Sequence, residues 1–275
     1  SRKRKQAREK DGELEVTNSI NLFGGFQGGS SGPGGYSPGI WWRNLNTHPS
    51  RIEPSSGTAT TVFIEEQTDV VIEGFSILGP SVSSGDVRTI WTGDFPAEAN
   101  VTLLRNHLQG GTTSNGRCTV ARLAGQPSII ADNRFQGGES TTKTRSLWLG
   151  GRAFVMGNTV IGGTATAVGG NGTFGFDTYL PSEILLFDNY FAGGNDSRHS
   201  HAVNVSNGGI IAINNVMAGG DASFQSVGLV VSGGYVIAAS NHIFGGAGTE
   251  YSYGILKSDQ AAFHNNIITS GAATV

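Results

Sequence analysis

The sequence predicts an all-β chain wound into a single-stranded, right-handed parallel β-helix, a solenoid of about nine coils. Three observations support this fold class: a short block of residues recurs along the chain, its copies are evenly spaced, and the segments between them lack helical periodicity. The chain has 275 residues, of which 43 are glycine and only 14% are charged. So few charges argue against a disordered chain, which needs high net charge and little apolar content.

The repeated block consists of an apolar run, one or two polar residues, Asn, any residue, an apolar residue, any residue and Gly-Gly. Its copies run from residue 70 to the C-terminus, with anchors 25 to 31 residues apart. Roughly 25 residues accommodate three short strands and three bends, so each copy predicts one coil of a β-helix. The anchors are Phe75, Asn106, Asn133, Asn158, Asn189, Asn215, Asn241 and Asn266.

The asparagines predict a structural ladder at one bend of the coil. Parallel coils stack about 4.8 Å apart, so identical bends bring identical side chains into register. An Asn amide both donates and accepts, and can therefore bond the next coil and its own backbone. We expect the Gly-Gly pair to supply positive φ at the following turn. Ten residues before the anchors, a column of large side chains is expected in the interior: Leu123, Trp148, Tyr179, Val205, Val231 and Leu256.

The run before each anchor is apolar on both faces, although a strand sends alternate residues to opposite sides. We expect positions four and two before the anchor to face outward, because that set is the more polar at its ends. A bare apolar stripe of this size exceeds what monomers usually expose. We expect a second copy, residues 17–49 or a flattened coil to cover it. Its largest members, the predicted interface, are Phe154, Met156, Leu185, Phe187, Ile211 and Ile213.

Composition divides the chain into a basic leader at 1–16, disordered or helical, an entry or cap segment at 17–50, and a β-helix at 51–275. The first ten residues hold six Lys or Arg, yet the chain's net charge is −3, which lacks the basic footprint of nucleic-acid binding. The only cysteine, Cys118, cannot form an intrachain disulfide and is expected in the core. No apolar run is long enough for a transmembrane helix.

The repeat resembles that of the pectin-lyase-like superfamily of right-handed parallel β-helices, from about Ile52 to the C-terminus. The segments Leu22–Phe26, Trp41–Asn44 and Arg51–Pro54 are similar to the "GGF…W.R…I.P" opening of secreted or surface β-helix proteins of bacteria. The resemblance implies an extracellular or cell-surface location and more coils beyond both ends. Enzymes of this superfamily cut acidic polysaccharides. Their common Asn-Thr-Asp, Asp-Asp and Gly-His-Gly motifs do not occur in this chain.

Candidate catalytic residues cluster in the loop after the fourth asparagine repeat: Asp196, Arg198, His199 and His201. His199 and His201 alternate and would share one face of a strand, with Asp221 of the next coil nearby. They would form a metal pair or a base with an Arg partner, whereas the simpler interpretation is a solvated loop. We expect no cofactor and no metal; calcium is an alternative that no ligand set in the sequence supports.

Candidate ligand-binding residues are Trp91, Asp177, Tyr179 and Asp221. Trp91 would stack on a sugar or plug the coil, and the insertion at 167–177 would shape a binding surface beside the histidine loop. The preferred function is a non-enzymatic secreted or surface module with a structural, adhesive or glycan-binding role. The alternative is a polysaccharide lyase or glycoside hydrolase acting on an acidic polysaccharide. It is the less favoured function, because a hydrolase needs two nearby carboxylates and the sequence offers few.

Overall fold

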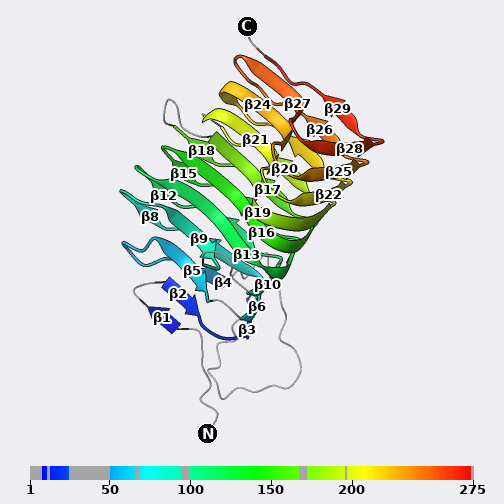
Figure 1. Ribbon diagram of the computed structural model, residues 1–275. Helices are drawn as coiled ribbons and strands as arrows, with labels where there is room; N and C mark the ends of the chain where they lie inside the picture. The colour runs from blue at the N-terminus through cyan, green and yellow to red at the C-terminus, as the bar shows by residue number, and fades with distance from the viewer. Residues whose placement is uncertain are drawn as a thin grey trace.

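The chain folds into a parallel β-solenoid of about eight turns, one fewer than the sequence suggested (Figure 1). The structure is a computed structural model and describes residues 8–10, 13–24, 50–65, 68–93, 99–166, 172–195 and 197–273. Every regular element within these ranges is a β-strand. None of them lies in a helix that is long and apolar enough to cross a membrane.

The strands form three walls and one short turn sheet. The long wall contains β1 (Arg8–Lys10), β2 (Glu13–Val16), β5 (Thr60–Ile64), β9 (Val87–Trp91), β13 (Arg117–Ala131), β16 (Lys143–Met156), β19 (Gly172–Phe187), β21 (Ser197–Val205), β24 (Ala222–Val231) and β27 (Tyr251–Lys257). The middle wall contains β3 (Ile20–Phe23), β6 (Asp69–Glu73), β10 (Asn100–Leu104), the C-terminal ends of β13, β16 and β19, then β22 (Gly209–Ile213), β25 (Tyr235–Ala239) and β28 (Gln260–His264).

The third wall contains β4 (Ser50–Ile52), β7 (Phe75–Leu78), β11 (His107–Gln109), β14 (Arg134–Gln136), β17 (Thr159–Ile161), β20 (Tyr190–Ala192), β23 (Val216–Ala218), β26 (His242–Phe244) and β29 (Ile267–Thr269). The turn sheet contains β8 (Ser81–Val82), β12 (Thr112–Thr113), β15 (Glu139–Ser140) and β18 (Thr164–Ala165). Neighbouring coils pair in parallel; the exception among these pairs is β1 with β2, which is antiparallel.

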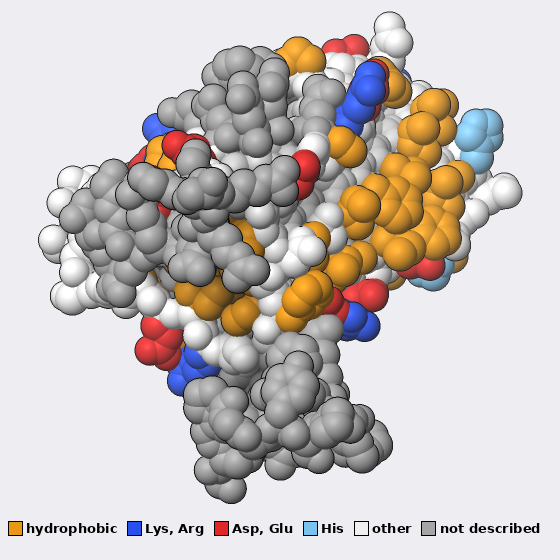
Figure 2. All heavy atoms as spheres, turned by 90° about the horizontal axis from the view of Figure 1, so that it is seen from below, with side chains coloured by type: hydrophobic (Ala, Val, Ile, Leu, Met, Phe, Trp, Pro, Cys, Tyr) orange, Lys and Arg blue, Asp and Glu red, His pale blue; other side chains and the backbone are white. Residues whose placement is uncertain are grey.

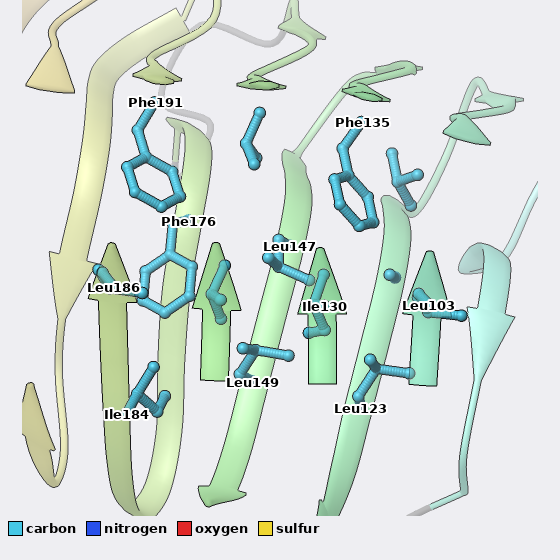
Figure 3. Close-up of a cluster of buried hydrophobic side chains, with 14 of the residues drawn as sticks. Leu103, Leu123, Ile130, Phe135, Leu147, Leu149, Phe176, Ile184, Leu186 and Phe191 are labelled. Carbon is cyan, nitrogen blue, oxygen red and sulfur yellow. The ribbon is translucent and has the colours of Figure 1, made fainter. Parts of the chain in front are cut away.

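The core is a stack of side-chain columns inside the three walls. Leu103 pairs in register with Ile72 on one side and Ile130 on the other, and all three are fully buried. Figure 3 shows aromatic side chains of the third wall, Phe135 and Phe191, pointing toward apolar side chains of the other walls. Burying such columns on every coil drives a chain with few charges to fold as a solenoid.

The asparagines lie between the middle and third walls and bond to one another from coil to coil. The Nδ2 of Asn133 donates to Oδ1 of Asn158 at 3.0 Å and to the carbonyls of Leu103 and Ala131. The same Oδ1 also accepts the backbone N–H of Asn133 at 2.9 Å. Corresponding amide-to-amide bonds link Asn106, Asn133, Asn158, Asn189, Asn215, Asn241 and Asn266.

The expected positive φ at the Gly-Gly pairs is wrong. Positive φ occurs instead at the residue before each anchor, as at Asp132 (56°), Gly157 (65°) and Asn214 (56°). The paired glycines are needed because of close approach: a Cβ on Gly138 would overlap the carbonyl oxygen of Gly111 in the preceding coil. Asn and Asp tolerate the left-handed conformation better than other side chains, which explains the polar residue before the anchor.

The expected interior column is wrong at three of its six positions. Leu123, Val205 and Val231 are buried, whereas Leu256 is exposed. In register, Trp148 pairs with Arg122 and Asp177, and Leu123 pairs with Leu149. Trp148 and Tyr179 therefore belong to the outer surface of the long wall, because a register shift next to Gly151 displaces the count.

Alternation on the middle wall follows the predicted direction. Ile210 and Ala212 are buried and Ile211 is exposed on the same strand.

Cys118 is buried, and burial raises the pKa of its thiol to about 12. The described part of the basic leader is extended, not helical, since β1 and β2 join the long wall. β3 pairs in register with β6, so the solenoid begins before residue 51.

Candidate functional site

The outer face of the long wall is bent in every coil. Two successive residues point into the core, Val120 with Ala121 in β13 and Ser146 with Leu147 in β16, and all four are fully buried. A straight strand alternates, so the chain turns between them. The outward side chains before and after this turn, three residues apart, then approach each other.

This approach pairs cations with aromatic rings. The Arg88 guanidinium carbon lies 4.4 Å from the ring centre of Trp91, and that of Arg145 lies 4.0 Å from Trp148. The guanidinium of Arg122, one coil before Trp148, lies 4.6 Å from the same indole. Such cation–π contacts contribute about 0.5–2 kcal/mol each, more where water is excluded.

Tyr179 completes the group that we call the arginine–aromatic cluster: Arg122, Arg145, Trp148, Asp177 and Tyr179. The Tyr179 ring lies 4.4 Å from the ring of Trp148 and 4.9 Å from the guanidinium carbon of Arg122. It sits over Gly150, where any side chain would meet it. The cluster therefore presents two rings in contact, tilted by 45° to each other, with guanidinium groups around them.

Asp177 orients one of these guanidinium groups. It accepts a 2.6 Å bond from Nε of Arg145 on one carboxylate oxygen and a 2.7 Å bond from Nδ2 of Asn204 on the other. Arg145 and Asp177 are both buried. With both oxygens engaged, Asp177 positions Arg145 and is unsuited to general acid or base work.

Two donors of the cluster lack acceptors. Within the described residues, Nη1 of Arg145 and the indole Nε1 of Trp148 are shielded from solvent and have no hydrogen-bond partner. A buried unpaired donor costs about 1–3 kcal/mol, and native structures retain few of them. The cluster therefore holds two buried N–H groups beside its rings that would gain from an oxygen acceptor.

A second run of aromatic and basic groups extends the cluster along the same wall. Lys143 Nζ lies 4.3 Å from the ring centre of Phe174, which makes an edge contact with His201. His199 in turn contacts Phe224 at 5.4 Å between ring centres. Burial, and to a smaller extent the neighbouring charge of Arg145, lower the pKa of Lys143 to about 8, while Asp177 opposes the shift. The amine thus loses its charge within the range of mild alkaline conditions.

The two candidate histidines share the outer face, as their spacing predicted, with ring centres 6.1 Å apart. Burial lowers the pKa of both, that of His201 to about 3, and the neighbouring cations Arg198 and Lys143 add to the effect. The guanidinium of Arg198 lies over Phe224. Asp221 is exposed, and Asp196 lies outside the described residues. No group of three metal-ligating side chains occurs in the described part of the chain.

Of the proposed ligand-binding residues, the structure brings Asp177 and Tyr179 together in one cluster, and Trp91 pairs in register with Arg122 of that cluster, one coil earlier. Trp91 contacts Phe63 at 5.3 Å between ring centres and donates from Nε1 to the Gly93 carbonyl. Arg122, Lys143 and Arg145 were not predicted from the sequence to be site residues. Their signal is the row of basic residues on the long strands: Arg88, Arg117, Arg122, Lys143, Arg145 and Arg198.

Comparison of the chain with protein-family models, with curated proteins and with solved structures found no match. The parallel β-solenoid and the arginine–aromatic cluster on its long wall are thus the evidence on which a function rests.

Proposed function

We propose that this chain is a non-enzymatic β-helix module, secreted or displayed on a cell surface, that binds an acidic glycan along the outer face of its long wall. The observation that carries the proposal is the arginine–aromatic cluster with its two unpaired donors. Sugar rings stack on aromatic faces, and guanidinium groups recognise carboxylate or sulfate oxygens. The resemblance of the repeat to pectin-lyase-like proteins supports the same class of ligand.

Local charge favours an acidic over a neutral glycan. The chain's net charge is −3, yet the long-wall parts of β9, β13, β16 and β21 carry six basic residues. Asp177 forms an ion pair with Arg145, whose Nε lies 2.6 Å from Oδ2 of Asp177. Arg122 and Lys143 add further positive charge to the same face, which raises the local concentration of anions.

Binding should be measured by isothermal titration calorimetry with polygalacturonate and heparin as acidic probes and dextran as the neutral one. We expect binding of an acidic probe that weakens with added salt. Arg122→Ala and Trp148→Leu should each weaken it at least tenfold. Arg134→Ala is the matched control, because Arg134 lies on the third wall, and it should bind like the parent chain.

Equal affinity for dextran, or unchanged binding in both cluster variants, would contradict the proposal. Binding should also decline between pH 7 and 9, because Lys143 loses its proton near pH 8. Lys143→Arg, which keeps the charge, should remove that decline.

A second candidate function, a polysaccharide lyase, is favoured by one observation. Lys143 with its lowered pKa lies near the Arg145–Asp177 pair, so a neutral amine is available to take a proton beside a guanidinium that would hold a uronate carboxylate. Elimination produces an unsaturated uronate that absorbs ultraviolet light. Release of this product from polygalacturonate, lost in Lys143→Ala, would favour the lyase over the binding module.

A further inference from the structure

The outward side chains of the middle wall form a continuous apolar surface. We call it the apolar stripe: Ile129, Phe154, Met156, Leu185, Phe187, Ile211, Ile213 and Ile237. Ile129, Ile211 and Ile237 are 44%, 41% and 42% exposed, and the others are half-buried. Seen from below, exposed hydrophobic side chains gather in a broad band at the right, the side on which Figure 1 draws β22, β25 and β28 (Figure 2).

Polar groups border the stripe, and a hollow lies within it. Arg152 and Glu183 form an exposed ion pair at one edge, with Nε and Oε2 2.9 Å apart. The hollow has a volume of about 420 Å³ and is lined by Phe154, Leu185, Ile211 and Tyr235 among others. An apolar centre with a polar rim is the usual composition of a protein–protein interface.

We propose that the apolar stripe is a self-association surface, on which a second copy of this chain packs face to face with its solenoid axis antiparallel to the first. The two-fold axis lies along the strand direction, between the coils of Phe154 and Leu185. Phe154 then faces Leu185 of the other copy, and Ile129 faces Ile211. Such an isologous contact is closed and produces a dimer.

The stripe has enough area for a stable dimer. Large aromatic side chains bury roughly 150–250 Å² each when fully covered, and the stripe's Ile, Leu and Met side chains fall at or below the lower end of this range. Eight stripe residues and Tyr235, exposed by up to 44%, therefore present on the order of 600 Å² per copy. Two copies would bury about 1,200 Å² in total, the lower end of specific interfaces.

The rim charges are self-complementary about the same axis. Arg152 and Glu183 occupy equivalent positions in neighbouring coils and are paired in register. Rotation about an axis between these coils places Arg152 of each copy opposite Glu183 of the other. The ion pair of one copy and the ion pair of the other thus become a group of four alternating charges, which favours this register over others.

The first experiment measures mass by sedimentation velocity over a range of concentrations. We expect the parent chain to sediment as a dimer and Ile211→Lys as a monomer. Circular dichroism should show that the Ile211→Lys variant is folded. Tyr190→Lys is the matched control: Tyr190 is 41% exposed on the third wall, so this variant should stay dimeric. A monomeric parent chain would overturn the proposal, including the case in which another segment of the same chain covers the stripe. A dimeric Ile211→Lys variant would also overturn it, as would a mass that keeps rising beyond two copies.

The second experiment tests the position of the axis by mixing variants. Arg152→Glu and Glu183→Arg each place four like charges around the axis, so each alone should dissociate more readily. A mixture of the two brings two Glu opposite two Arg and should recover the parent's association. Recovery cannot arise from the pair within one chain, because each variant still has like charges there. No recovery on mixing overturns the antiparallel arrangement.

Discussion

Each asparagine amide serves three coils, which makes this residue costly to replace. Asn189 Nδ2 donates to Asn215 Oδ1 and to the carbonyls of Val155 and Phe187, while its Oδ1 accepts two bonds from Asn158. Because the column is buried, water cannot replace these bonds. The residue type is therefore determined by hydrogen bonding between coils and not by chemistry on a ligand.

Asn189→Ala should lower the free energy of unfolding by about 3–5 kcal/mol, because several buried donors and acceptors lose their partners at once. Urea unfolding followed by circular dichroism measures the change. Asn266→Ala is the comparison: Asn266 is half-buried in the last described coil, where water can compensate, so its loss should be smaller. Equal losses at both sites would contradict the role assigned to burial.

His201 makes stability depend on pH. Its pKa is about 3 in the folded chain, against 6.5 as the ordinary value, because burial disfavours the charged ring. The unfolded chain binds the proton more readily, so stability is complete above pH 6.5 and declines as the pH falls toward 3. Between pH 7 and 5 the loss should approach about 2 kcal/mol.

His201→Phe should flatten this dependence, since no proton is then taken up at this site on unfolding. Midpoints of urea unfolding from pH 4.5 to 7.5 provide the measurement. His264→Phe, at an exposed position, should keep the slope of the parent chain. A parent slope that persists in His201→Phe would show that other groups cause it.

At the scale of the element, the sequence predicts the bend between the middle and third walls but not the register of the long wall. The asparagine block encodes its bend locally, in consecutive residues. The long wall lies beyond an irregular turn, with register shifts between Gly125 and Ser128 and between Leu149 and Gly151. Counting back from the anchors crosses this turn, which is why Trp148 and Tyr179 were expected inside.

Counting forward from the Gly-Gly pairs avoids that turn. Thr144, Ser200, Ser226 and Ser252 each follow the second glycine by six residues, and all lie in one inward column. The hydroxyl of Ser200 donates to the Gly194 carbonyl at 2.7 Å, which fixes the turn. The outward neighbours of this column include Arg145 and His201. The candidate site was thus encoded in the sequence, though only the structure shows which anchor to count from.

The paired glycines allow adjacent coils to touch at the turn before the long wall. Gly138→Ala should cost more than about 4 kcal/mol or prevent folding, because its Cβ would overlap backbone atoms that cannot move independently. Gly57→Ala is the control: it has φ of +86° but no atom within 4 Å of an added Cβ. It should cost only about 1–2 kcal/mol, the strain of a left-handed residue. Thermal unfolding of both variants measures the two losses in stability.

At the scale of the whole molecule, the solenoid separates its surfaces by chemistry. The long wall carries the basic and aromatic residues, the middle wall the apolar stripe, and the bend between the middle and third walls the buried asparagines. A stack of parallel coils permits this separation, because each wall is built from the equivalent segment of every repeat. The proposed glycan site and the proposed dimer surface therefore lie on different walls, and variants of one should leave the other unchanged.

The same stacking predicts graded stability along the axis. Each coil contacts only its neighbours, so local opening depends on how well a coil is covered. In the central coils, Phe135, Val160 and Phe191 of the third wall are fully buried. In the last described coil, Ile267 is 57% and Ile268 44% exposed, although Ile268 continues the inward column. Strands with few buried contacts open at low free energy.

Native-state hydrogen exchange followed by mass spectrometry should therefore find the slowest amides in β13, β16 and β19 and the fastest in β28 and β29. The asparagine bonds should reinforce the gradient, since Asn241 is fully buried and Asn266 is half-buried. Asn189→Ala should accelerate exchange in the adjacent coils, at β17, β20 and β23, more than in β5 and β9. Uniform exchange along the axis, or equal acceleration in every coil, would mean that the solenoid unfolds as one cooperative unit and that neighbour contacts do not set its local stability.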